Sequence, residues 1–154
     1  MVAAHGTTVM RVCRAVVGVD DADDAWSETF LAALRAYPDL PAGTNMEAWL
    51  VTVAHRRSLD MVRARARRPV PTAQPPDAPA DTDTATREVW ALVARLPPAQ
   101  RRAVAYHHLA GLSHAEVAGV VGCSTDAARR ACADGMAALR AMLVPVNPTR
   151  EDIR

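Results

Sequence analysis

One arginine-rich segment near the middle of the chain has the residue types that bind nucleic acid. Six arginines and one acid fall between residues 55 and 68, so a surplus of positive charge remains whatever ion pairs form. Arg56, Asp60, Arg63 and Arg67 follow at spacings of four, three and four, which places them on one helical face. Guanidinium groups bind phosphate and a ring such as Trp49 can stack on an unpaired base, which indicates single-stranded nucleic acid. The alternative is a solvated face on which Asp60 pairs with neighbouring arginines.

A second segment carries the opposite charge. Five acids and no base fall between Asp20 and Leu31. A helix through this segment would carry one apolar side chain among polar and acidic side chains on its polar face. Such a surface suits the docking of a basic partner helix. The residues of this face are Asp24, Ser27, Glu28, Leu31 and Arg35. The alternative is a solvated face whose acidic start is favoured by the helix dipole.

The sequence gives little support to an enzyme or a metal protein. No GxxxxGK[ST], GxSxG or HExxH motif is present. His107 and His108 are adjacent, so we expect them on different sides of a helix, unsuited to sharing a metal ion. His114, Cys123 and Cys132 are spaced unlike any standard zinc finger. We therefore expect no catalytic activity, no cofactor and no metal.

Composition limits the size and location of the protein. The chain has 154 residues, which fits one medium domain or two small ones and excludes a large catalytic barrel. The net charge is only +1, so nucleic-acid binding must rest on local segregation of charge. Three cysteines without CxxC spacing are expected to be reduced core thiols. No signal peptide or membrane span is evident, so we expect a soluble, cytoplasmic protein without membrane insertion.

Apolar residues at helical spacing predict three helices in the N-terminal part of the chain. The first covers residues 7–17, the second runs from Asp20 to the residue before Pro38, and the third runs from Asn45 towards Arg68. The second helix is expected to bury Ala22, Ala25, Trp26, Thr29, Phe30, Ala33, Leu34 and Tyr37. The third is expected to bury Met46, Trp49, Leu50, Val53, Ala54, Met61 and Val62.

A proline-rich stretch divides the chain. Five prolines fall between Pro69 and Pro79 among few large apolar residues, which predicts an extended linker over residues 69–86. The fold class is therefore all-α, with small helical domains at residues 1–68 and 87–146 and a tail at 147–154. A domain of about 60 residues buries only about 60% of its unfolded surface, so each half is individually marginal.

The C-terminal part has the pattern of a helix-turn-helix. Apolar stripes predict one helix ending before Pro97 and another over residues 98–110. A short helix over 115–121 then ends at Gly122, and Ser124 can cap a longer helix from 125 to about 142. A short helix, a glycine-containing turn and a second helix form the helix-turn-helix signature, although an ordinary helical hairpin can mimic it.

The order of these features resembles one family. An acidic DDADDAWSETFLAAL helix is followed by EAWLVTVAHRRSLDMVRARARR, a proline-rich linker and LPPAQRRAVAYHHLAGLSHAEVAGVVGCS. From residue 9 to residue 143 the chain resembles the two-domain RNA polymerase sigma factors of the extracytoplasmic-function (ECF) group. The resemblance implies a non-enzymatic subunit that directs promoter-specific transcription initiation. Its implied partners are core RNA polymerase, promoter DNA and an anti-sigma factor.

The resemblance also implies roles for individual residues. The acidic helix would bind polymerase through Asp24, Ser27, Glu28, Leu31 and Arg35. The arginine-rich helix would melt and hold the minus-ten promoter element through Asn45, Trp49, His55, Arg56, Asp60, Arg63 and Arg67, and the loop over 39–45 takes the place of one that captures a flipped base. The helix-turn-helix would read the minus-thirty-five element through Ser124, Thr125, Asp126, Arg129 and Arg130.

The sequence also departs from the family pattern. Arg56 stands where asparagine is usual, and Ser27 stands where glutamine is usual. Residues 131–135 replace a basic run: Asp134 repels phosphate, and Gly135 costs roughly 1 kcal/mol in a helix interior. The stretch over 131–135 favours an alternative, a sigma-like regulatory interaction protein with reduced DNA reading, whereas Trp49 and the arginine-rich helix favour the sigma factor.

Overall fold

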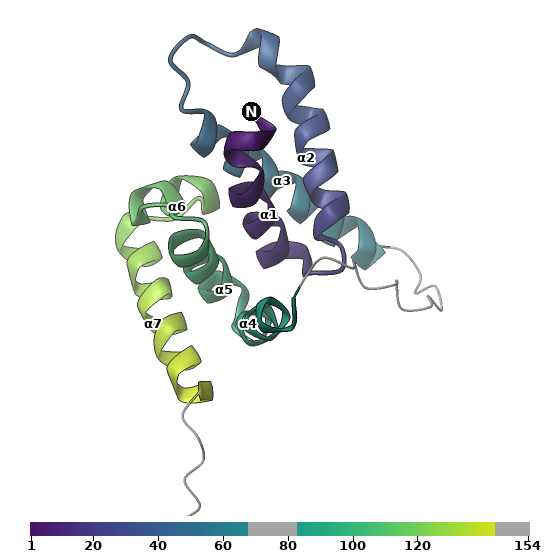
Figure 1. Cartoon of the computed structure of the whole chain (residues 1–154). Coiled ribbons are helices and arrows are strands. Elements are labelled where there is room, and N and C mark those ends of the chain that lie inside the picture. Colours follow the sequence, from purple (N-terminus) through teal and green to yellow (C-terminus); the bar gives the residue numbers. More distant parts are fainter. Residues whose placement is uncertain (68–82, 144–154) are drawn as a thin grey trace, which may run out of the picture.

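The computed structural model describes residues 1–67 and 83–143, and every regular element in these two ranges is a helix. The all-α prediction is confirmed (Figure 1). Residues 69–82 of the predicted linker and the predicted tail over 147–154 lie outside the described residues. The elements are α1 Val2–Val17, α2 Ala22–Ala36, the 3-10 turn η1 Tyr37–Asp39, α3 Met46–Arg67, α4 Thr84–Ala94, α5 Pro98–Val104, the π-helix η2 Ala105–Leu109, α6 His114–Val121 and α7 Thr125–Leu143.

The N-terminal half is a three-helix unit in which α1 packs against both α2 and α3 (Figure 1). Small residues let the helices approach closely, since the buried faces are largely alanine and valine. Trp26 Nε1 also donates a hydrogen bond of 2.9 Å to the carbonyl of Gly6, which ties α2 to α1. The buried residues are Val9, Val12, Cys13 and Ala15 of α1, Ala22, Ala25, Thr29, Phe30 and Ala33 of α2, and Leu50, Val51, Ala54, His55 and Ser58 of α3.

Three details of this half differ from the sequence-based expectation. Helix α1 begins at Val2, five residues earlier than predicted. The chain continues past Ala36 in a 3-10 turn that includes Pro38, because proline is tolerated in the first turn, where its missing N–H needs no partner. Leu34, Tyr37 and Val62 are 58%, 52% and 41% exposed, although all three were expected in the core. The apolar stripe of α2 therefore ends at Ala33.

The C-terminal half owes its helix boundaries to local caps. Helix α4 begins at Thr84, inside the segment predicted as linker, because Asp83 Oδ1 accepts from the N–H of Thr86 at 2.9 Å. Ser113 Oγ caps α6 by accepting from the N–H of Glu116 at 3.1 Å. Gly122 then ends α6 in the left-handed conformation at φ 80°. Helices α6 and α7 form the predicted helix-turn-helix, and both α5 and α6 pack on α7.

The helix predicted over residues 98–110 changes character half-way. It is α-helical in α5 and becomes a π-helix in η2, where Ala110 N–H donates to the carbonyl of Ala105 at 2.9 Å. Such one-turn π segments often occur at functional sites. Here the π turn carries Tyr106, which is fully buried.

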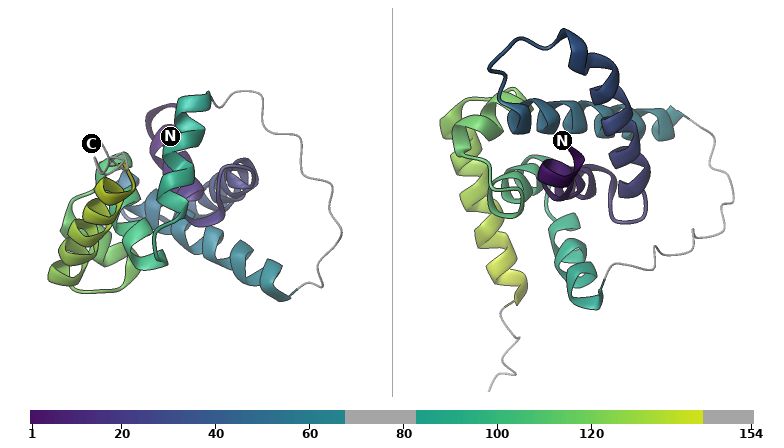
Figure 2. Two further views of the ribbon diagram at one scale, coloured as in Figure 1. Left: turned by 90° about the horizontal axis from the view of Figure 1, so that it is seen from below. Right: turned by 45° about the horizontal axis from the view of Figure 1, so that its top comes forward.

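The two halves pack on each other and share one hydrophobic core. Helix α1 contacts α4, α5 and η2, and α3 contacts α6 (Figures 1 and 2). Hydrogen bonds between described residues join the halves, among them one from Arg11 Nη1 to the carbonyl of Leu109 at 2.6 Å and the contact of His55 Nδ1 with the hydroxyl of Tyr106 at 2.7 Å. The sequence predicted two halves joined by a linker and gave no indication that the halves pack on each other.

At Gly135, α7 lies close against α5. A Cβ atom at this position would lie 2.6 Å from Val104 Cγ2 and 3.3 Å from Gln100 Cβ. The residue is buried within the helix. Packing therefore explains a glycine that the sequence presented as a departure from the family pattern.

We expect Gly135→Ala to destabilise the protein. Overpacking against Val104 costs about 1–3 kcal/mol, which exceeds the gain of about 1 kcal/mol in helix propensity. The matched control is Gly119→Ala in α6, where an added Cβ meets nothing within 4 Å and helix propensity alone should raise stability. Urea unfolding followed by circular dichroism measures both variants. Equal stabilisation by the two substitutions would contradict the packing role of Gly135.

Candidate nucleic-acid and polymerase interfaces

The outer face of α3 is the most basic surface of the N-terminal half. Arg56, Asp60, Arg63 and Arg67 are all exposed, as their spacing predicts. Asp60 pairs with Arg63 at 3.8 Å, and both side chains are more than 60% exposed, so the pair contributes at most about 1 kcal/mol. Arg65 points elsewhere and pairs with Asp21 at the start of α2. One carboxylate therefore faces three arginines, and a surplus of positive charge remains on this face.

The loop before α3 is held in a defined shape. Thr44 Oγ1 donates to the carbonyl of Pro41 at 2.7 Å, and Gly43 has a φ of 83°, a value that favours glycine. Asn45 Oδ1 accepts from the N–H of Ala48 at 3.2 Å and so caps α3. The loop borders a hollow of about 360 Å³ lined by Tyr37, Pro38, Leu40, Pro41, Ala42, Gly43, Thr44 and Met46. A predicted nucleic-acid residue, Asn45, thus also has a structural role.

His55 does not lie on the exposed basic face where it was predicted to meet DNA. It is only 5% exposed and packs edge-on against Tyr106, with ring centroids 5.7 Å apart. Burial, together with the charges of Arg102, Arg56 and Arg63, lowers the pKa of His55 to about 4. Burial raises the pKa of Tyr106, so its hydroxyl stays protonated beside a neutral imidazole. In this arrangement His55 is a core residue, which corrects the expectation of an exposed ring.

The acidic face of α2 is exposed along its length. Its predicted residues are all accessible, and Leu31 is 50% exposed at the centre of the face. Leu34 and Tyr37 extend the apolar part of this surface towards the end of α2, which the sequence analysis missed because both residues fit the core period. A hollow of about 490 Å³ separates this face from α3 and is lined by Asp24, Ser27, Glu28, Arg57, Asp60, Met61 and Ala64.

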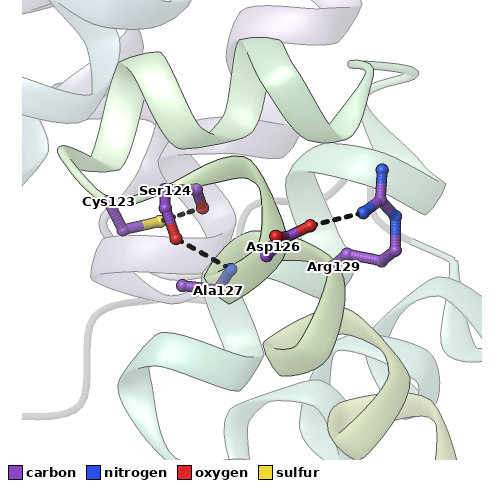
Figure 3. A network of polar contacts seen from close by, with 5 residues as sticks. All are labelled: Cys123, Ser124, Asp126, Ala127 and Arg129. Carbon is purple, nitrogen blue, oxygen red and sulfur yellow. Dashed lines mark hydrogen bonds and ion pairs between the residues drawn. The ribbon is translucent and has the colours of Figure 1, made fainter.

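Figure 3 shows the polar contacts at the start of α7, where Ser124, Asp126, Arg129 and Arg130 are exposed and Thr125 is half-buried. Ser124 Oγ accepts from the N–H of Ala127 at 3.1 Å, so this hydroxyl caps the helix as predicted. Asp126 pairs with Arg129 at 2.8 Å, which partly neutralises one of the two arginines expected to meet DNA. Arg130 is exposed beside them. The surface is therefore accessible but less basic than the arginine count suggests.

The cysteines and histidines of the C-terminal half do not form a metal site. Cys123 is exposed and its thiol donates to the carbonyl of Ser124, whereas Cys13 and Cys132 are buried, so the core-thiol expectation is wrong for Cys123. His107 and His108 lie closer than predicted, with ring centroids 4.8 Å apart. Within residues 1–67 and 83–143 no group of three potential ligands could hold a metal ion. In the same ranges no helix is long and apolar enough to cross a membrane.

Two solved structures share the fold of this chain. The sigma factor RpoE of Bartonella quintana, solved in complex with the anti-sigma factor NepR, superimposes with a TM-score of 0.75 at 18% identity and covers 92% of this chain and 93% of that one. CnrH, solved with the cytosolic domain of CnrY, gives a TM-score of 0.70 at 24% identity, covering 92% and 84%. At these identities the likeness concerns the fold alone.

Sequence comparison extends the likeness to the family. Residues 1–68 match the family model "Sigma-70 region 2" and residues 86–139 match "Sigma-70, region 4". The ECF RNA polymerase sigma factor SigC of Mycobacterium tuberculosis is 34% identical over 134 residues, covering 82% of this chain and 72% of that protein. The two family models match in the expected order, and the relative matches over most of both chains. All three indicate the same family. The chain belongs to the ECF group of the sigma-70 family, the non-enzymatic factors that direct RNA polymerase to initiate transcription at promoters.

Proposed function

We propose that this chain uses three separate surfaces for the three binding functions of a sigma factor. The face of α2 with Asp24, Ser27, Glu28, Leu31 and Arg35 binds core polymerase. The loop before α3, together with Asn45, Trp49, Arg56, Asp60, Arg63 and Arg67, binds the melted minus-ten element. The start of α7, with Ser124, Thr125, Asp126, Arg129 and Arg130, meets the minus-thirty-five element. The domain boundaries that go with this proposal are 1–68 and 87–146, joined by a linker over 69–86.

The observation that carries the proposal is the separation of charge on exposed helical faces. An acidic face with an apolar centre at Leu31 suits a basic protein helix, while the arginine face of α3 suits phosphate. Trp49 lies on α3 and is partly exposed, so it can offer a ring to an unstacked base. The hollow beside the loop, about 360 Å³, has room for one flipped base. No catalytic step is assigned to the chain itself, and we place its action in the cytoplasm, where the polymerase works.

An anti-sigma factor is the proposed regulatory partner. Both solved neighbours described above are complexes: CnrH with the cytosolic domain of CnrY, and the sigma factor RpoE with the anti-sigma factor NepR. The present chain has the same fold, so a protein of this class is the partner we propose for it.

One of the sequence features that favoured the alternative, a sigma-like regulator with reduced DNA reading, has a structural explanation. Gly135 has a packing role against Val104 and Gln100, so it is no longer a sign of a decayed recognition helix. Asp134 remains exposed on α7, and Asp126 is paired with Arg129. Transcription of genomic DNA from the chain's own bacterium, with core polymerase and this chain, separates the two functions. Defined start sites support the sigma factor, whereas core binding without defined start sites supports the regulator.

The acidic face of α2 should be needed for polymerase binding. We expect Asp24→Lys combined with Glu28→Lys to weaken binding to core polymerase at least tenfold, about 1.4 kcal/mol, because two favourable charges become repulsive. A titration of labelled core polymerase measures the dissociation constant. The matched control is Glu116→Lys with Asp134→Lys, which reverses two exposed acids of the C-terminal half. An equal loss in the control would assign the effect to net charge and not to this face.

The basic face of α3 should set the salt dependence of promoter opening. Each phosphate contact to a single strand contributes about 0.7 to the slope of log affinity against log salt, so Arg56→Ala with Arg63→Ala should lower the slope by roughly 1.4. Permanganate footprinting should show a weaker promoter bubble in the same variant. Arg95→Ala with Arg140→Ala removes two exposed arginines away from α3 and serves as the control. A bubble of normal intensity in the α3 variant would argue against this assignment.

A further inference from the structure

A small hollow lies within the C-terminal half, between α5, α6 and α7. Its volume is about 220 Å³, and alanine and valine side chains form most of its walls. Ala103, Val117 and Ala128 are at most 3% exposed and close it on the inner side. Cys123 and Ala127, at the turn and the start of α7, are exposed and border it on the outer side (Figure 3). The hollow is therefore apolar inside and accessible from solvent.

The hollow exists because small residues stand where the three helices meet. Five of its nine lining residues are alanines, which come from α5 and α7. Further along the same pair of helices, Gly135 lies so close to Val104 that an added Cβ would clash. The contact between α5 and α7 is thus tight at Gly135 and open near Ala128. Apolar cavities of this kind stay free of water and bind small apolar molecules.

Arg102 of α5 gives this apolar hollow a positive charge. Among the described residues that line the hollow, no other is charged. The Arg102 side chain is half-buried, and its guanidinium makes no hydrogen bond or ion pair with any described residue. A charge that is partly removed from water without a partner is unfavourable. An anion that enters the hollow would supply the missing partner.

The size and charge of the hollow define the class of ligand. One guanidinium matches one carboxylate through two parallel hydrogen bonds, whereas a phosphate monoester carries up to two charges and calls for more donors. A volume of about 220 Å³ is roughly seven times the ~30 Å³ that a water molecule occupies in the liquid. A ligand of about eight non-hydrogen atoms therefore fits, and most of these atoms must be apolar.

We propose that this hollow binds a small apolar monocarboxylate. The carboxylate pairs with Arg102, and the hydrocarbon part fills the space between α5, α6 and α7. The ligand then lies directly beneath the start of α7, next to Cys123 and Ala127. The site goes beyond the proposed function and does not depend on it, because its lining residues all belong to the C-terminal half.

Protection of the native Cys123 thiol tests the site in the full chain. Hexanoate is the probe, since it has about the right number of atoms. Cys123 is the exposed cysteine, whereas Cys13 and Cys132 are buried, so maleimide should react first at Cys123 and mass spectrometry of its peptide follows the rate. With a dissociation constant of about 1 mM, about 5 mM hexanoate leaves one-sixth of the molecules unbound, so the rate should fall about sixfold.

Two further ligands separate charge from apolar contact. Acetate carries the carboxylate without the hydrocarbon chain, and 1-hexanol carries the chain without the charge. Each lacks one of the two interactions on which binding depends, so each should slow the reaction of Cys123 less than about twofold at the same concentration.

Two substitutions should abolish the protection by hexanoate. Arg102→Gln removes the charge, and Ala131→Leu fills the hollow with a larger apolar side chain. Arg95→Gln is the matched control, because Arg95 is an exposed arginine of the same half that does not line the hollow, and it should keep the full protection. Circular dichroism checks that each variant is folded, and Ala131→Leu provides the test should Arg102→Gln fold poorly.

Three results would overturn the proposal. Hexanoate that leaves the rate at Cys123 unchanged in the unsubstituted chain shows that the hollow does not bind it. Equal protection by 1-hexanol shows a pocket for a neutral apolar group, such as a side chain of a protein partner. Undiminished protection in both Arg102→Gln and Ala131→Leu places hexanoate elsewhere. The experiment contains neither polymerase nor DNA, so its failure leaves the proposed function untouched.

Discussion

Helix α1 belongs to the N-terminal half but packs against helices of both halves, and both halves depend on its side chains for burial. On one side α1 packs against α2 and α3, and on the other it meets α4, α5 and η2. Units of about 60 residues bury too little surface to be robust alone. This chain is also poor in aromatic residues, at 4%. A single core that both halves share increases the surface that each half buries. Its alanine and valine residues also allow close contacts between helices.

The shared core forms where the two halves meet. The polar residues of the three proposed surfaces stay outside the shared core, with His55 as the exception. A buried polar contact at the seam, such as the one between His55 and Tyr106, adds little to stability but requires one specific register of packing. The arrangement of the two halves is therefore well defined without being held by a large polar network.

Local signals in the sequence predicted most of the helices and their ends. Ser124 and Gly122 act through neighbouring backbone groups, so their roles as cap and helix stop could be inferred from a few residues. The exposure of Leu34 and Tyr37 could not be inferred in this way. The helical period shows which side chains share a face, but it does not show where the neighbouring helix ends. The burial of His55 depends on Tyr106, 51 residues away, and the need for Gly135 depends on Val104 in another helix. Such long-range contacts leave no trace in spacing, which is why charge patterns located the candidate surfaces but misplaced one of their residues.

The exposed start of α7 has a consequence for how this protein can diversify. Ser124 and Gly122 fix the turn, and Ala128, Cys132 and Gly135 hold the helix in place from its buried side. The outward residues between them, such as Asp126 and Arg130, support no part of the core. Substitutions at such surface positions usually change stability by less than about 0.5 kcal/mol. On the proposed assignment of this surface to promoter DNA, point mutations at the tip of one helix can change DNA preference without first needing compensating changes in the scaffold.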